Sequence, residues 1–275
     1  MLLPRLAIAA LALLAASPAT AQSLGLFDSP PDQLKRYTDC MALARSEPIK
    51  ALPVAEKWQA SGGGLPARHC AALALFEAGR YGPAATALEA IAHDMGHDRP
   101  GLRAELWAQA GQAYMEAGMA ERAADVQSRA LDLKSNDPDL WLDRGLSYAA
   151  LRAWPRAISD FDRALKLRPD DVEVLVLRAA AWRNAGDPAR AFDDATRALK
   201  LAPDHSEARL ERGFANLARG ERSLANDDFN SVLRLVASSS AAARRAQAGL
   251  RGEQPAASTQ DAPSAPPAAK GGGKR

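Results

Sequence analysis

The chain has 275 residues and a formal net charge of +2, from 35 basic and 33 acidic residues. This near balance excludes a protein that binds nucleic acid through a general excess of positive charge. Beyond residue 21, arginine and aspartate interrupt every apolar run within a few residues, so the sequence predicts no transmembrane helix.

Residues 1–21 have the pattern of a cleavable signal peptide. Arg5 provides a short positive start, residues 6–16 form an apolar run, and Ala-Thr-Ala at residues 19–21 supplies the small residues of a cleavage site. The run is too short to span a bilayer. The cleavage region contains no cysteine, so the sequence does not indicate a lipoprotein anchor. The alanine- and arginine-rich composition resembles that of bacterial proteins, so we expect export to the periplasm.

The next two segments are predicted to be an extended leader, residues 22–31, and two divergent helical hairpins, residues 32–98. Apolar residues recur at helical spacing through both hairpins, although the pattern is degraded. A glycine run at residues 62–64 ends the first hairpin. The sequence Gly-Arg-Tyr-Gly-Pro at residues 79–83 separates the two helices of the second.

The chain contains two cysteines, and each falls in the first helix of one of these hairpins. First helices lie side by side in a stack of hairpins, so Cys40 and Cys70 are expected to form a disulfide in an oxidising compartment. Closing a loop of about 30 residues stabilises a fold by roughly 3–4 kcal/mol in the chain-entropy model. A metal pair or a redox pair is the alternative, but the Cys-x-x-Cys spacing is absent.

The segment from residue 93 to residue 98 raises a second metal alternative. His93 and His97 have the i, i+4 spacing that suits one helix face, and aspartates stand beside them. However, Gly96 between the histidines and Pro-Gly at residues 100–101 indicate the end of a helix and a solvated loop. The sequence has no His-Glu-x-x-His, Gly-rich phosphate loop or Gly-x-Ser-x-Gly, so it indicates no catalytic site and no cofactor.

Residues 104–239 can be written as four superimposable rows that begin at residues 104, 138, 172 and 206, a step of 34 residues. Three columns hold small residues: Gly111, Gly145, Ala179 and Gly213; Ala123, Ala157, Ala191 and Ala225; and Ala130, Ala164, Ala198 and Val232. Two columns hold large residues: Trp107, Trp141 and Leu175, and Tyr114, Tyr148 and Trp182. Each row has two helical runs around a short breaker, which predicts a helical hairpin. One hairpin cannot bury its apolar face alone, so the hairpins must stack.

A repeat of about 34 residues with these columns resembles the tetratricopeptide repeat, or TPR. The resemblance implies an all-α fold, a right-handed α-solenoid of about six TPR-like helical hairpins. Residues 104–239 would be four regular repeats, and residues 240–251 would form a capping helix over the end of the stack. Residues 252–275 are rich in proline, alanine, serine and glycine, which predicts a disordered tail. Its basic tip either solubilises the chain or contacts an anionic envelope surface.

One pair of columns departs from the common TPR pattern. The residue before the small column is usually apolar in TPRs, but three rows have an arginine there and an aspartate sixteen residues later: Arg144 and Asp160, Arg178 and Asp194, and Arg212 and Asp228. The first row has Ala110 and Val126 instead, so both positions change together. This joint change predicts structural ion pairs between the two helices of a hairpin. An arginine ladder that binds anions is the alternative.

In TPR proteins the first helices line a concave groove, and the resemblance carries this role over column by column. The groove positions are Asp139, Leu142, Leu146, Glu173, Val176, Glu207, Leu210, Glu211 and Phe214, together with Glu105, Ala108, Gln112, Ala180 and Leu217. The basic residues with which one TPR subclass clamps a C-terminal carboxylate are absent. We therefore expect an apolar floor with an acidic rim. The acids also suit helix N-termini, and the floor residues also suit packing between hairpins.

These features predict a non-catalytic protein–protein interaction scaffold of the bacterial cell envelope. Its partner would be a protein segment with apolar anchors and basic flanks, bound in the concave groove. The alternatives are a metal-dependent factor or enzyme that uses the loop between His93 and His97, and an accessory subunit that stabilises a larger complex.

Overall fold

The computed structural model describes residues 31–254, and the predicted signal peptide, nearly all of the leader and the tail from residue 255 lie outside them. The described part forms helices and no strands. The helices are α2 (Pro31–Ser46), α3 (Pro48–Ala60), α4 (Gly64–Glu77), α5 (Tyr81–Asp94), α6 (Pro100–Glu116), α7 (Ala120–Leu133), α8 (Pro138–Ala150), α9 (Trp154–Leu167), α10 (Val172–Asn184), α11 (Pro188–Leu201), α12 (Ser206–Ala218), α13 (Arg222–Leu235) and α14 (Ala241–Leu250). Within this part, no helix is long and apolar enough to cross a membrane.

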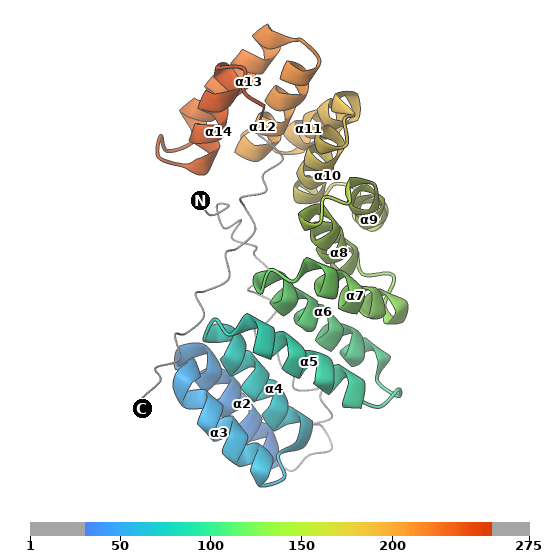
Figure 1. The fold of residues 1–275 in the computed structure, drawn as a ribbon, viewed down its shortest axis with the longest axis vertical. Coiled ribbons are helices and arrows are strands. Elements are labelled where there is room, and N and C mark those ends of the chain that lie inside the picture. The colour runs from blue at the N-terminus through green and yellow to red at the C-terminus, as the bar shows by residue number, and fades with distance from the viewer. Residues whose placement is uncertain (1–30, 255–275) are drawn as a thin grey trace, which may run out of the picture.

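The helices form six consecutive hairpins, from α2–α3 to α12–α13, and each hairpin packs against the next. The stack follows an open arc, with α6 and α8 on its inner side and α7 and α9 on its outer side (Figure 1). The all-α solenoid predicted from the sequence is therefore confirmed. Helix α14 packs against α12 and α13, in the place where the first helix of another hairpin would stand.

The small columns create the close contact between the two helices of a hairpin. A Cβ atom added to Gly145 would lie 2.6 Å from the ring of Phe161, and one added to Gly213 would lie 2.6 Å from the ring of Phe229. No side chain fits at that distance, so the glycine lets the aromatic ring of the second helix lie directly on the backbone of the first. This packing fixes the separation of the helices in each hairpin.

The turns inside the hairpins are also set by the 34-residue repeat. Gly118, Gly186 and Gly220 adopt positive φ between the first and second helices, where glycine bears no Cβ penalty. Arg152 occupies the same position in the fourth hairpin with φ 57°. A left-handed conformation costs a residue with a side chain roughly 1–2 kcal/mol, so this turn is held by the packing of α8 on α9.

A disulfide joins the first two hairpins through their first helices, α2 and α4. Cys40 and Cys70 form it, with their Cα atoms 6.1 Å apart. Beside it runs a buried hydrogen-bonded chain, in which the Tyr37 hydroxyl donates to Nδ1 of His69 and Nε2–H of His69 donates to the Gln109 side chain, over 2.8 and 2.9 Å. Burial lowers the pKa of His69, which keeps the ring in the neutral form that makes both bonds. Covalent and polar links therefore tie α2, α4 and α6 together.

We predict that replacing both cysteines by serine weakens the attachment of the α2–α3 hairpin by roughly 3–4 kcal/mol, because the loop between residues 40 and 70 is no longer closed in the unfolded chain. Hydrogen exchange of α2 and α3 measures this change locally. Reductant should destabilise the natural protein and leave the double variant unaffected. Two titratable thiols in freshly purified, folded protein would contradict the prediction.

Candidate binding surface on the first helices

The structure brings together all three predicted arginine–aspartate pairs. Each arginine on a first helix binds both oxygens of its aspartate on the second helix through Nε and Nη2, over 2.6–2.9 Å. The aspartate side chains are only 5–10% exposed, and the arginines 18–27% exposed. Such forked, shielded pairs fix the register of two helices.

Two of these arginines also reach the preceding hairpin. Nη1 of Arg144 donates to the Ser128 hydroxyl over 3.0 Å, and Nη1 of Arg178 binds Asp162 over 2.5 Å. The arginine column thus links each of these hairpins to its neighbour as well as holding its own two helices together. These guanidinium groups are occupied by groups of the protein itself, which supports their structural interpretation over an anion-binding ladder.

In the middle of the inner face, some of the predicted groove residues are partly open. Leu142 and Leu146 of α8 and Ala108 of α6 are half-buried and pack against the core with part of their surface. Val176 of α10 is buried, at 7% exposure, so its predicted place in an open groove is wrong. Gln112, also half-buried, lies in the same column as Leu146. This part of the surface carries apolar and amide groups that the packing of the hairpins leaves partly open.

The C-terminal part of the inner face is not an open groove, and the predicted exposure of Leu210, Glu211 and Phe214 is wrong. All three are buried, and the ring of Phe214 packs on Phe229 with the ring centres 4.9 Å apart. Arg183 and Arg245 lie over the ring of Phe214 at 5.6 and 5.7 Å. The reason is α14: it lies against α12 and covers these positions.

Four acidic residues of the predicted rim already have side-chain partners inside the protein. Asp139 pairs with Arg168 over 3.0 Å, Glu173 with His205 over 2.9 Å, and Glu207 with Arg245 over 2.5 Å. Glu211 is bound by both Arg183 and Arg245, over 2.9 and 2.7 Å. Burial disfavours the charged form of Glu211, but the two arginines outweigh it and keep its pKa below the usual range. The expectation of a free acidic rim therefore fails at these four residues.

Asp143 of α8 is an inner-face acid that the sequence analysis missed. It is half-buried, and within the described part of the chain its only side-chain partner is Nε2 of Gln112, at 3.4 Å from Oδ2. Burial raises the pKa of Asp143 to about 7, and the negative charges of Asp139 and Asp137 act in the same direction against the hydrogen bond from Gln112. The sequence contained a signal that could have indicated Asp143. It stands in the same column of the 34-residue repeat as Gln109, Leu177 and Glu211, and Glu211 was one of the predicted groove residues.

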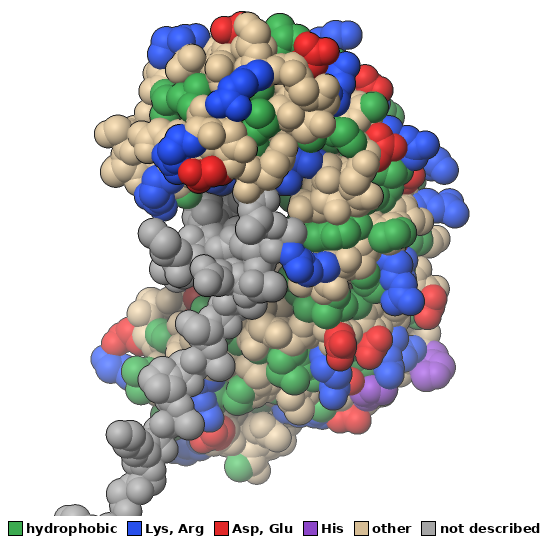
Figure 2. Space-filling model, turned by 45° about the horizontal axis from the view of Figure 1, so that its top comes forward, with side chains coloured by type: hydrophobic (Ala, Val, Ile, Leu, Met, Phe, Trp, Pro, Cys, Tyr) green, Lys and Arg blue, Asp and Glu red, His purple; other side chains and the backbone are tan. Residues whose placement is uncertain are grey.

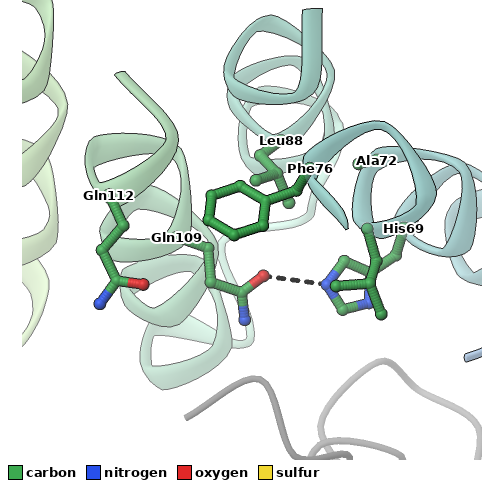
Figure 3. Close-up of a pocket in the computed structure, with 7 residues that line it drawn as sticks. His69, Ala72, Phe76, Leu88, Gln109 and Gln112 are labelled. Carbon is green, nitrogen blue, oxygen red and sulfur yellow. Dashed lines mark hydrogen bonds between the residues drawn. The ribbon is translucent and has the colours of Figure 1, made fainter. Parts of the chain in front are cut away.

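A small pocket lies between α4 and α6, with α5 behind it. It has room for about one water molecule, and Figure 3 shows the ring of Phe76 and the side chain of Leu88 forming its apolar wall. His69 and Gln109 face each other across its mouth, joined by their hydrogen bond, and Gln112 stands on the next turn of α6 (Figure 3). Gln112 therefore lines the pocket and also contacts Asp143.

The two histidines of the alternative metal site have separate partners. His93 lies in the last turn of α5, where its ring meets the edge of Trp107 and Nε2 lies 3.2 Å from Arg129. His97 lies in the loop after α5, with Nδ1 3.2 Å from Arg103. Among residues 31–254, no group of three or more histidine, cysteine, aspartate and glutamate side chains is placed to hold a metal ion.

Comparison with known proteins agrees with this geometry. Residues 110–182 match the family model of the tetratricopeptide repeat. Residues 110–182 therefore carry TPRs. This match covers one part of the four predicted repeats, and the resemblance stated from the sequence columns is confirmed. No curated protein matches the sequence.

Solved structures show the same fold at low sequence identity. The C-terminal part of a TPR protein from Cytophaga hutchinsonii is 18% identical with a TM-score of 0.61, over 72% of this chain and 78% of that one. A crystal structure of MamA is 17% identical with a TM-score of 0.54, over 59% and 92%. A double mutant of MamA RS-1 is 17% identical with a TM-score of 0.52, over 70% and 96%. At these identities the likeness establishes the TPR fold of the chain.

We predict that Arg178→Ala and Asp194→Ala each cost about 1–3 kcal/mol, because either change leaves a shielded charge without its partner. The double variant should cost less than the sum of the two. Urea unfolding followed by circular dichroism measures all three. The exposed pair Arg197 and Asp170 is the control, with an expected coupling below about 1 kcal/mol. Additive losses at Arg178 and Asp194 would show that the two side chains do not interact.

Phe214→Ala should lower the stability of the C-terminal hairpin by about 3–5 kcal/mol, because it removes a fully buried ring from between Phe229 and two guanidinium groups. The matched control is Phe192→Ala, since Phe192 is half-buried and should cost much less. Thermal unfolding compares the two variants. A loss below about 1 kcal/mol for Phe214→Ala would contradict the buried position of this residue and support the predicted open groove.

Proposed function

We propose that this chain is a non-catalytic interaction scaffold of the bacterial cell envelope, which binds a segment of a partner protein on the inner face of its TPR solenoid. TPR folds generally mediate protein–protein interaction. The observation that carries the proposal is the half-buried surface of α6 and α8, where Ala108, Gln112, Leu142 and Leu146 use only one side in the packing of the hairpins.

The chemistry of this surface defines the class of partner. Apolar side chains beside amide groups suit a peptide, because the former bury its side chains and the latter hydrogen-bond its backbone. Acidic and basic side chains are interspersed over the face shown in Figure 2, with hydrophobic side chains between them. A nucleic acid would require a continuous basic stripe, so this distribution favours a protein partner.

The location in the envelope rests on two features. The signal peptide predicted at residues 1–21 would direct export, and the disulfide between Cys40 and Cys70 suits an oxidising compartment. The two features are independent of each other and lead to the same compartment. The periplasm is therefore the proposed location, with the mature chain starting at Gln22.

A photo-crosslinking residue placed at Leu142 or Leu146 should capture the same protein partner in intact cells, and it should do so on a chain that begins at Gln22. The matched controls are Ser159 and Arg163, which are exposed on the outer helix α9 of the same hairpin. They should capture this partner at least about tenfold less, since a bound segment on the inner face lies out of their reach. Mass spectrometry of the crosslinked bands measures both the partner and the processed end.

Equal capture from α8 and α9 would move the binding surface away from the inner face. A chain that retains its first residues in the cytoplasmic fraction would contradict the proposed location without affecting the binding proposal.

A further inference from the structure

Asp143 is a half-buried carboxylate of the inner face that has no cationic partner among the described residues. Asp139, Glu207 and Glu211 each have an arginine partner within 3.0 Å, and Glu173 accepts a hydrogen bond from His205. No lysine, arginine or histidine nitrogen of the described residues lies within 4.0 Å of Asp143, which receives only the weak hydrogen bond from Gln112. Removing a carboxylate from water without a counter-charge is unfavourable, and a cation placed beside it recovers that free energy.

The surroundings of Asp143 define what can approach it. Leu146 lies one turn further along the same face of α8, and Leu142 is its neighbour in the chain; both are half-buried and apolar. Asp139, one turn earlier, is held by Arg168 on the edge of the arc. A cationic side chain therefore meets a carboxylate with apolar walls, where Coulomb attraction is less screened than at an open surface.

The apolar part of the site is the half-buried face of α8 beside Asp143. Leu142 and Leu146 pack against the core with part of their surface and leave the rest open. The pocket between α4 and α6 offers no room for a side chain of a partner, because Ala72, Leu73 and Leu88 in its wall are less than 5% exposed. Gln112 lines this pocket and also bonds Asp143, so it joins the two parts of the inner face.

We propose that Asp143 receives a lysine or arginine side chain of the bound partner segment, while an apolar side chain a few residues away in that segment packs on Leu142 and Leu146. The proposal deepens the proposed function and rests on it. It assigns the cation recognition to one residue that the acidic columns did not include, and it removes that role from the four acids that have partners in the chain. Charge complementarity at Asp143 and the half-buried leucines beside it together specify the occupant.

The test selects random linear peptides of roughly 12 residues on the full mature chain. The selected peptides should contain lysine or arginine near an aliphatic or aromatic residue. One of them is then measured against Asp143→Asn and against Asp139→Asn, the matched control on the same helix face. Asp143→Asn should weaken binding about tenfold, and Asp139→Asn less than about threefold. Changing the peptide's basic residue to alanine should cost the same factor with the natural protein and nothing with Asp143→Asn, while circular dichroism verifies that both variants are folded.

The possible outcomes separate the two proposals. Peptides selected without a basic residue, or an equal loss from the peptide's alanine change in both proteins, would overturn the role of Asp143 and leave the peptide-binding scaffold intact. Failure to select any peptide would count against both. If peptides are selected only after Lys270, Lys274 and Arg275 are changed to alanine, the occupant of the site is the chain's own tail, and the assignment to a partner is overturned.

Discussion

The structure depends on one constraint: a helical hairpin in this chain cannot bury its own apolar faces. Each hairpin has small residues where its helices meet and large residues on the surfaces it offers to its neighbours. Gly145 lies under Phe161 inside one hairpin, while Arg178 binds Asp194 inside the next and Asp162 in the one before it. The stack therefore forms as a chain of nearest-neighbour contacts, and its stability is a sum of such contacts. A weak hairpin needs an extra link, and the first one has the disulfide to α4.

The sequence columns predicted the regular part well because each column has one physical cause. In one kind of pair, a glycine of the first helix lies under an aromatic ring of the second helix. In the other, an arginine precedes an aspartate by sixteen residues. Both pairs are consequences of two helices packed at a fixed distance. Such pairs repeat with the step of 34 residues, so more than one copy of the same evidence supports each prediction. The helical hairpins and the arginine–aspartate contacts follow from the sequence for this reason, without reference to any other protein.

The same columns failed where an element outside the four rows intervened. Arg245 belongs to α14, and it stands one further step of 34 residues after Glu211 in the same column. Its guanidinium binds Glu207 and Glu211 and lies over Phe214. The four rows predicted an open groove at these three residues. In that prediction α14 covered the end of the stack and did not stand in the next position of the inner face. Extending the columns by one row would have shown the basic residue opposite the acids.

The inner face consequently has two different halves. At α10, α12 and α14 its charges are neutralised internally, and Arg183, Glu211 and Arg245 form a network that any peptide would have to break. Truncating such a network leaves buried charge behind, so an occupant gains little there. At α8 the carboxylate of Asp143 has no cationic partner among the described residues, and Leu142 and Leu146 beside it are only half-buried. Binding free energy comes from groups that the free protein leaves unsatisfied, and these groups lie toward the disulfide-linked end. The charge network of α12 and α14 therefore occupies its own part of the inner face, and the groups that a partner segment of the proposed kind would meet lie at α8.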